Sequence, residues 1–327
     1  MNIGKSGIKA SVIGLGFWQL GSKLWGKGGN NKERALKIIQ RAAELGINLF
    51  DTAEIYGMGE SERVLGYAIR NLSLKESAII VSKIAGFRVE RKDIEKSIKM
   101  INSRIGREVD IILHHWPPDR GKICNVVQAL EQIVKEGKAH YYGLSNYGDE
   151  ALRFVLSCTK SLEPVADELQ YSLGYRTIER GTMELLKKNN ISLIAWSPLA
   201  KGALAGATAK SIVQRADPVF NEIKKEAVLN EVLENLARKR GVTRAAISLL
   251  WIVSKGGIPI PGTMNERRVE EYAAAGEIEL RADEIEALDR ASSKFVNLWG
   301  NNYLQPRPIV SLPKALQALL VNLMRGI

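Results

Sequence analysis

The stretch from Ala78 to His115, AIIVSKIAGFRVERKDIEKSIKMINSRIGREVDIILHH, carries the pattern that decides the fold. Its two ends, Ala78–Lys83 and Asp110–His115, are short apolar runs rich in β-branched residues, which predict buried strands. Between them, Asp93–Ile105 places isoleucine at positions 94, 98, 101 and 105, the spacing of one helical face. A strand, a helix and a second strand in succession predict parallel strands joined by a helical crossover.

The same alternation extends in both directions from this unit. We predict further strands at Ser11–Leu15, Asn48–Asp51, Ala139–Gly143, Pro164–Leu169, Ser192–Ala195 and Ile258–Pro261. We predict further helices at Glu33–Glu44, Ser61–Arg70, Val126–Glu136, Glu150–Cys158, Met183–Asn189, Lys224–Lys239, Val242–Ser254 and Asp283–Ala291. Eight strand–helix units in a chain of 327 residues favour the α/β class and a closed (β/α)8 TIM barrel.

We expect three additions to this barrel. They are an N-terminal β-hairpin, an extended loop after the seventh strand from Gly202 to about Asn221, and a C-terminal extension. The whole chain, 1–327, is expected to form one domain, with 292–327 as a loop and helical tail. A doubly wound open sheet is the rival fold, but its GxGxxG fingerprint fails because Gln19 occupies the third glycine position after Gly14 and Gly16.

Composition narrows the classes of function. The 47 basic and 36 acidic residues give a net charge of +11, which suits an anionic ligand, a nucleic acid or an acidic surface. Aromatic residues are only 6% and form no basic stripe, so a lysine-rich solvated surface is favoured over nucleic-acid binding. Three histidines argue against a multi-histidine metal site, and Cys124 and Cys158 are too few for a disulfide framework. Without a signal peptide or membrane-spanning run, we expect a cytoplasmic protein.

Candidate catalytic residues lie at or just after the ends of three consecutive predicted strands. Asp51 closes the second strand and Tyr56 follows it in a loop, Lys83 ends the third strand, and His115 ends the fourth. In a barrel these ends share one mouth, where active sites lie. Tyrosine has a pKa near 10, which a nearby ammonium lowers, and a carboxylate keeps that ammonium charged. With a histidine to orient a carbonyl or relay a proton, this is a general acid for carbonyl reduction.

The order of motifs resembles the aldo-keto reductase family. The matching motifs, from about residue 4 to residue 291, are Gly14-Leu15-Gly16, Asp51-Thr52-Ala53 with Tyr56-Gly57, Gly59-Glu60-Ser61-Glu62, Lys83, His115-Trp116-Pro117, Gly143-Leu144-Ser145-Asn146-Tyr147, Trp196-Ser197-Pro198-Leu199 and Ile258–Thr263. The resemblance implies that Tyr56 is the proton donor, with Lys83 and Asp51 setting its pKa. It also implies that His115 orients the substrate and that His114, turned away, is a packed or capping residue.

The resemblance also implies a nicotinamide cofactor. Ser145 and Asn146 match the pair that holds the carboxamide, and Glu168 stands where the family has a glutamine. Glutamate accepts a hydrogen bond from the amide but, when ionised, donates none and places negative charge near the ring. Trp196 replaces the usual tyrosine that stacks on the ring. The remaining residues implied in cofactor binding are Ser197, Leu199, Lys201, Gly262, Asn265, Arg268 and Glu271.

The adenine end departs further from the family pattern. Met264 stands in place of a lysine and Tyr272 in place of an asparagine, whereas Arg268 keeps its position. Because arginine suits the 2′-phosphate of NADP through bidentate donors, we favour NADP (NADPH) and leave NAD possible.

The substrate is expected to be a small-molecule carbonyl compound or alcohol in a mostly apolar pocket. Its candidate lining residues are Trp18, Trp25, Phe87, Trp116 and Trp299. The leucine-rich tail from Pro313 is expected to pack on the barrel, to meet another subunit in an oligomer, or to touch a membrane surface. Two other functions stay open: a nucleotide-binding regulatory subunit with little turnover, as in potassium-channel β-subunits, and an aldolase with Lys83 as a Schiff base.

Overall fold

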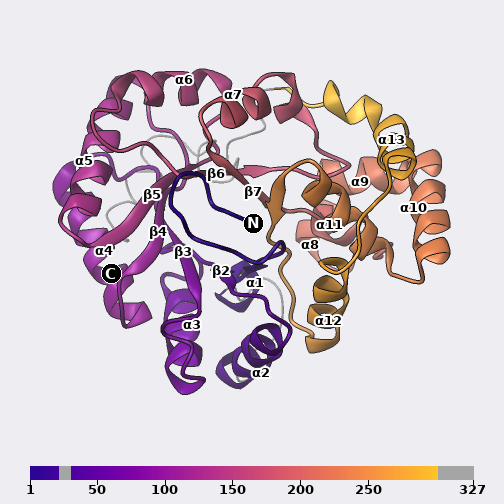
Figure 1. Ribbon diagram of the computed structural model, residues 1–327, viewed down its shortest axis with the longest axis horizontal. Coiled ribbons are helices and arrows are strands. Elements are labelled where there is room, and N and C mark those ends of the chain that lie inside the picture. The colour runs from indigo at the N-terminus through magenta and orange to yellow at the C-terminus, as the bar shows by residue number, and fades with distance from the viewer. Residues whose placement is uncertain (22–30, 301–327) are drawn as a thin grey trace.

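The computed structural model describes residues 1–21 and 31–300. Its strands form one parallel sheet in the order of the sequence (Figure 1). They are β1 (Leu15–Gly16), β2 (Leu49–Asp51), β3 (Ile79–Ile84), β4 (Val109–His114), β5 (Ala139–Ser145), β6 (Ala166–Gln170), β7 (Ser192–Trp196) and β8 (Gly257–Pro259). The Gly14 N–H donates to Pro259 O at 2.9 Å and the Gly16 N–H to Pro261 O at 3.1 Å, which joins the last strand to the first. The predicted (β/α)8 barrel is therefore confirmed.

Helices surround the strands. They are α1 (Trp18–Gly21), α2 (Asn31–Glu44), α3 (Glu60–Asn71), α4 (Arg91–Ile105), α5 (Ile123–Lys135), α6 (Asp149–Cys158), α7 (Thr182–Lys188), α8 (Ile212–Arg215), α9 (Pro218–Lys225), α10 (Ala227–Arg240), α11 (Arg244–Ser254), α12 (Glu266–Ala275) and α13 (Ala282–Ala291). Helix α11 is buried on all sides over residues 245–252. The α4 isoleucines at 94, 98, 101 and 105 are at most 1% exposed, so the helical spacing read from the sequence does mark the buried face.

Two predicted elements differ from the structure for local reasons. The first strand is reduced to Leu15–Gly16, because the Ser11 N–H bonds the Asn48 side chain at 2.7 Å and Ser11 Oγ bonds Ile13 O at 2.7 Å. The predicted helix Lys224–Lys239 is split into α9 and α10 at Glu226, whose ψ of 87° is not helical. We did not predict α12, which begins at the Asn265 cap.

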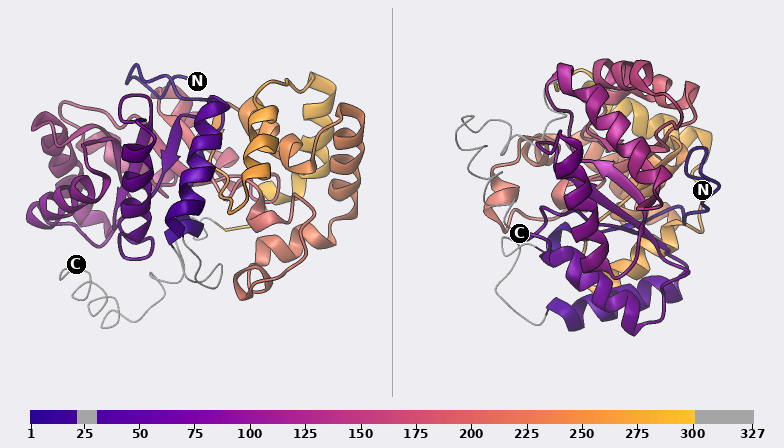
Figure 2. Two further views of the ribbon diagram at one scale, coloured as in Figure 1. Left: turned by 90° about the horizontal axis from the view of Figure 1, so that it is seen from below. Right: turned by 90° about the vertical axis from the view of Figure 1, so that its left-hand side faces the viewer.

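The predicted N-terminal hairpin is present in a short form. Asn2 and Lys9 form an antiparallel bridge, and Ile3 is fully buried in the cluster of barrel-interior residues. Gly4 lies so close to the sixth-strand segment that a Cβ would come within 2.4 Å of Val165 O, which only glycine permits. The hairpin therefore closes one end of the barrel, opposite to the end where α8 and α9 lie (Figure 2).

The structure pairs the two cysteines. Cys124 of α5 and Cys158 of α6 form a disulfide between residues 34 apart in sequence. The sequence argument considered only their number and spacing, and a separation of that length does not reveal that two neighbouring helices bring them together.

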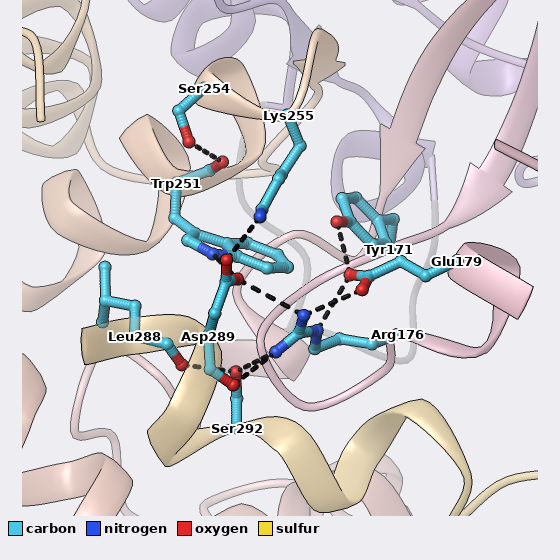
Figure 3. A network of polar contacts seen from close by, with 9 residues as sticks. All are labelled: Tyr171, Arg176, Glu179, Trp251, Ser254, Lys255, Leu288, Asp289 and Ser292. Atoms are coloured by element: carbon cyan, nitrogen blue, oxygen red, sulfur yellow. Dashed lines mark hydrogen bonds and ion pairs between the residues drawn. The ribbon is translucent and has the colours of Figure 1, made fainter. Parts of the chain in front are cut away.

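The segment after β6 is tied to the C-terminal part of the described chain. The Arg176 guanidinium lies 2.8 Å from the Glu179 carboxylate and 3.3 Å from that of Asp289 (Figure 3). The Arg176 N–H also donates to Phe295 O at 3.2 Å. This network holds residues 292–300, including the 3-10 turn Ser293–Val296, against the barrel. The predicted tail beyond residue 300 lies outside the described residues.

Candidate active site

A buried ion pair lies where β2 and β3 end. Asp51 pairs in register with Val81, so the Lys83 side chain, two residues further on the same face, reaches the Asp51 carboxylate. The Lys83 Nζ is 2.6 Å from both Asp51 oxygens and 3.0 Å from Thr52 O. Burial opposes charge on Lys83, but Asp51 and Glu168 raise its pKa above the ordinary value. Lys83 is therefore held as an ammonium.

Tyr56 lies beside this ammonium in the turn after β2. The Lys83 Nζ is 5.1 Å from the centre of the Tyr56 ring. Burial raises the pKa of the phenol above 10, Lys83 lowers it, and the charge of Asp51 raises it. The prediction that Lys83 makes this phenol more acidic holds for the effect of Lys83 alone. Burial outweighs that effect, so the pKa of Tyr56 is raised rather than lowered. Tyr56 therefore stays protonated at neutral pH, which is the form that a proton donor needs.

The adjacent histidines of β4 face opposite sides of the barrel wall. The His115 ring is 5.7 Å from the Tyr56 ring, and its buried Nδ1 has no hydrogen-bond partner among the described residues. Burial and then Lys83 lower the pKa of His115 well below 6.5, so its imidazole is neutral. His114 is fully buried, with Nδ1 2.7 Å from the Tyr147 hydroxyl and Nε2 3.2 Å from Arg88 O. His114 is a packed residue, as the sequence predicted.

Polar groups at the ends of β5 and β7 border the catalytic candidates Asp51, Tyr56, Lys83 and His115, which we call the tetrad. The Asn146 amide donates to His115 O at 2.9 Å and to Ser145 Oγ at 3.0 Å, and its Oδ1 accepts from the Trp196 indole at 3.0 Å. Asn146 has a φ of 62°, in the left-handed region that asparagine tolerates better than most residues. These bonds fix both the amide and the indole beside His115.

Glu168 joins the tetrad, which the sequence did not predict. Its Oε2 lies 3.2 Å from the Lys83 Nζ, and its side chain is almost fully buried. Burial and then the Asp51 charge raise the pKa of Glu168 well above its ordinary value. Gln170, two residues later on β6, lies on the same face of the strand. The sequence indicated a glutamate near a nicotinamide, but not a second carboxyl on the catalytic lysine.

The loop after β7 contains the candidates Ser197, Leu199 and Lys201 and has an unusual backbone, although Leu199 itself has an ordinary φ of -102°. Ser197, Ala200 and Lys201 have φ values of 53°, 46° and 54°, a strained region for residues other than glycine. Lys201 forms an ion pair with Asp217, and its carbonyl accepts from Gln214 at 2.9 Å. Asp217 is a residue that sequence reasoning missed. The dipeptide Asp217-Pro218 predicts a helix N-cap, and Asp217 does cap α9. The dipeptide does not indicate that Asp217 contacts Lys201.

The adenine-end candidates cluster at the start of α12. Asn265 caps the helix by accepting from the Arg267 N–H at 3.1 Å, and Arg268 is exposed. Tyr272 is buried, and burial, opposed by the Arg268 charge, raises its pKa to about 12. Gly262 bridges Gly16 where the barrel closes, and Glu271 follows on α12. These residues form one continuous edge from the barrel closure to an exposed arginine.

The aromatic candidates for a substrate pocket divide. Trp116 contacts His115 with ring centres 5.1 Å apart and Phe87 at 6.0 Å, so both extend the tetrad. Trp18 follows β1 and is 38% exposed. Trp299 is instead stacked on Tyr175 and donates to Gly174 O at 2.9 Å within a core cluster. Trp299 therefore packs in that cluster beside Tyr175, and its place in the substrate pocket stays a prediction. Trp25 lies outside the described residues.

Three further observations bound the site. Two surface hollows share Asp110 and His140, and neither is lined by a tetrad residue. Within residues 1–21 and 31–300, no cluster of three or more His, Cys, Asp or Glu residues could hold a metal ion. No helix in the same residues is both long enough and apolar enough to cross a membrane.

Comparison with known proteins agrees with this geometry. The sequence model of the Aldo/keto reductase family matches residues 12–293. A putative aryl-alcohol dehydrogenase of Saccharomyces cerevisiae is 26% identical, covering 88% of this chain and 95% of its own. A probable voltage-gated potassium channel subunit beta of Arabidopsis thaliana is also 26% identical, covering 85% and 90%.

Solved structures agree as well. An aldo-keto reductase from Klebsiella pneumoniae, in complex with NADPH, superposes with a TM-score of 0.74 at 25% identity, covering 88% of this chain and 93% of its own. Because the family match spans most of the chain, the protein belongs to the Aldo/keto reductase family.

Proposed function

We propose that this protein is an NADPH-dependent reductase that interconverts aldehydes or ketones and alcohols. The observation that carries the proposal is the buried Asp51–Lys83 ion pair beside Tyr56, with both Lys83 contacts to Asp51 at 2.6 Å. Membership of the family and its likeness to an NADPH-bound relative support it.

Tyr56 is the proton donor in this proposal. A hydroxyl that stays protonated at neutral pH gives its proton to the substrate oxygen as negative charge develops there. The ammonium of Lys83, clamped by Asp51, then stabilises the phenolate that is left. His115 is neutral, so its imidazole orients the carbonyl by a hydrogen bond without adding a second charge.

The residues around the tetrad fit a nicotinamide nucleotide. NADPH, when bound, supplies the hydride. Asn146 and Ser145 offer amide and hydroxyl groups that other contacts already hold in place, and the Trp196 ring is tied to Asn146. At the other end, the exposed Arg268 offers the bidentate donors that suit a 2′-phosphate.

Two other functions can be set against this one. The potassium-channel relative supports a regulatory subunit that binds nucleotide with little turnover. The tetrad favours an enzyme, because a protein that only binds has no need of a buried ion pair next to a tyrosine. The Schiff-base aldolase is disfavoured because the carboxyls raise the pKa of Lys83, whereas a nucleophilic amine needs a lowered one.

One experiment separates the alternatives. The purified protein is given a panel of aldehydes and ketones with NADPH or NADH, and oxidation of the nucleotide is followed by absorbance. Turnover with at least one carbonyl compound is expected. Tight nucleotide binding without turnover across the panel points to the regulatory subunit. Trapping of a substrate on Lys83 by borohydride points to the aldolase.

The choice of nucleotide tests the adenine end. In Arg268→Ala, we expect NADPH affinity to fall at least about tenfold while NADH affinity stays within about twofold, because a charge-assisted bidentate contact is worth about 1.5–3 kcal/mol. Direct titration of each nucleotide by protein fluorescence measures this. Arg267→Ala, the neighbouring exposed arginine, is the matched control. Equal losses of both nucleotides in Arg268→Ala would place recognition of the phosphate elsewhere.

A further inference from the structure

We propose that Glu168 is a proton-exchanging carboxyl, which keeps its proton when the reduced nicotinamide nucleotide binds and releases it when the oxidised nucleotide binds. The proposal deepens the reductase function above and rests on it. It concerns a residue by which this chain departs from the family pattern of a glutamine.

The position of Glu168 carries the proposal. Its Oε2 is buried, has no hydrogen-bond partner among the described residues, and is 3.2 Å from the Lys83 Nζ. In the sheet, Glu168 pairs with Ser145 of β5 and with Ile194 of β7. Ser145 and the neighbouring Asn146 are the residues proposed to hold the nicotinamide carboxamide. The Glu168 carboxyl therefore contacts the catalytic lysine and belongs to the strand that neighbours the residues proposed to hold the carboxamide.

The cluster contains one more carboxyl group than it contains cations. Lys83 brings one positive charge, and Asp51 already binds it with both oxygens at 2.6 Å. The titratable groups that act on Glu168 are Asp51 from β2, Tyr56 from the loop after β2 and Lys83 from β3. If Glu168 were also ionised, a buried cluster would carry an uncompensated negative charge, which is costly at low dielectric. A protonated Glu168 avoids this in the protein without nucleotide.

The two forms of the nucleotide treat this proton differently. A protonated carboxyl offers one donor and one acceptor, as the glutamine amide does, whereas a carboxylate offers only acceptors. The oxidised nicotinamide ring is a cation and the reduced ring is neutral. A cation beside Glu168 favours the carboxylate, and a neutral ring does not. Binding of the oxidised nucleotide thus lowers the pKa of Glu168, and the proton leaves to solvent.

Linkage makes this measurable without catalysis. If binding releases a proton, then by reciprocity affinity rises with pH, up to tenfold per pH unit for a full proton. The ratio of NADP⁺ affinity to NADPH affinity is expected to increase with pH in the wild-type protein. In Glu168→Gln, whose amide cannot ionise, the ratio is expected to stay flat.

Calorimetry gives the direct test. Each nucleotide is titrated into the protein in two buffers of different ionisation enthalpy, so that the number of protons exchanged is obtained. The 2′-phosphate titrates near pH 6 but is common to both nucleotides, so the difference between them removes its contribution. We expect wild type to release more protons with NADP⁺ than with NADPH, and Glu168→Gln to show no difference.

Asp167→Asn is the matched control. Asp167 is the adjacent carboxyl, fully buried, but it lies on the outer side of β6 and only accepts a long contact from the Tyr147 N–H at 3.5 Å. Burial raises its pKa as well. Its loss is expected to leave the difference in proton release between the two nucleotides as in wild type.

The outcomes distinguish this proposal from the function on which it rests. If neither nucleotide binds the wild-type protein, the reductase proposal fails. If both bind and wild type releases equal numbers of protons with each, the Glu168 proposal is overturned and the reductase stands. That result needs no variant, so it holds even if Glu168→Gln does not fold. An unchanged difference in Glu168→Gln would also overturn it.

Discussion

The inner and outer sides of the barrel wall use the same residue types for different ends. On β3, Ser82 points outward and donates to the Glu62 carboxylate at 2.7 Å, whose other oxygen is 2.8 Å from Arg104. One residue later, Lys83 points inward to Asp51 and Glu168. The Glu62 carboxylate and the Lys83 ammonium are both buried, and each lies next to a side chain of opposite charge.

The two sides differ in whether the buried polar atoms of these groups have hydrogen-bond partners. Both oxygens of the Glu62 carboxylate and both ring nitrogens of His114 have hydrogen-bond partners. On the inner side, His115 Nδ1 has no hydrogen-bond partner in the part of the chain that the structure describes, and neither has Glu168 Oε2 apart from its ion pair with Lys83. Buried polar groups are normally satisfied, so unsatisfied ones need a reason. We infer that the outer contacts stabilise the fold and that the inner groups, His115 and Glu168, are placed to bind a ligand. Asp167 Oδ2, on the outer side, also lacks a hydrogen-bond partner among the described residues, and burial raises the pKa of its carboxyl.

The tyrosines provide the strongest test of this contrast. Tyr56→Phe on the inner side is expected to lower kcat for carbonyl reduction by about 10²–10⁴-fold, because the proton donor is removed. Nucleotide affinity should stay within about twofold. Steady-state kinetics with NADPH and a carbonyl substrate found in the panel, together with nucleotide titration, measure both.

Tyr147→Phe is its outer counterpart. It removes the hydroxyl that lies 2.7 Å from His114 Nδ1, so it should lower the free energy of unfolding by about 1–3 kcal/mol and leave kcat nearly unchanged. Full activity in Tyr56→Phe would refute the assignment of the general acid. A large loss of kcat in Tyr147→Phe would show that the outer side also takes part in catalysis.

The adjacent histidines sharpen the contrast within one strand. His115→Ala is expected to lower kcat/KM by about 10²-fold with little change in stability, since its Nδ1 has no hydrogen-bond partner within residues 1–21 and 31–300. His114→Ala is expected to do the reverse, because it removes the hydrogen bonds to the Tyr147 hydroxyl and to Arg88 O. Kinetics and urea unfolding of both variants give the comparison. Equal effects on activity would remove the distinction between the two faces.

The pH dependence of stability gives the smallest expected effect. Burial lowers the pKa of His114 to about 4, against an ordinary value of 6.5. Between these values the unfolded chain binds the proton and the folded protein does not, so the free energy of unfolding falls as pH falls from about 6.5 to about 4. His115 acts in the same direction.

Replacement of His114 by Gln isolates this contribution. The slope of unfolding free energy against pH should become shallower by up to about 1.4 kcal/mol per pH unit, which is one proton's share. Urea unfolding at several pH values between 4 and 7 measures the slope. A slope equal to that of wild type would mean that His114 accepts its proton in the folded protein.

Local patterns were enough for the architecture. The isoleucine spacing of 94, 98, 101 and 105 and the apolar run Ala78–Lys83 predicted α4 and β3 to within two residues at either end, because helical and strand periodicities depend on neighbours in the chain. The order of strands followed, since parallel strands with short helical crossovers pair with their sequence neighbours. Positions at strand ends then identified Asp51, Lys83 and His115.

Contacts between distant segments needed the tertiary structure. No local pattern shows that Glu168 approaches Lys83, that Asp217 pairs with Lys201, that Cys124 meets Cys158, or that Trp299 packs on Tyr175. The pKa of Tyr56 belongs to the same group, because it depends on burial and on two carboxyls from other strands. The sequence by itself determined which residues reach the mouth of the barrel. Distances across that mouth decided their charges, because electrostatic and desolvation energies depend on separation in space rather than along the chain.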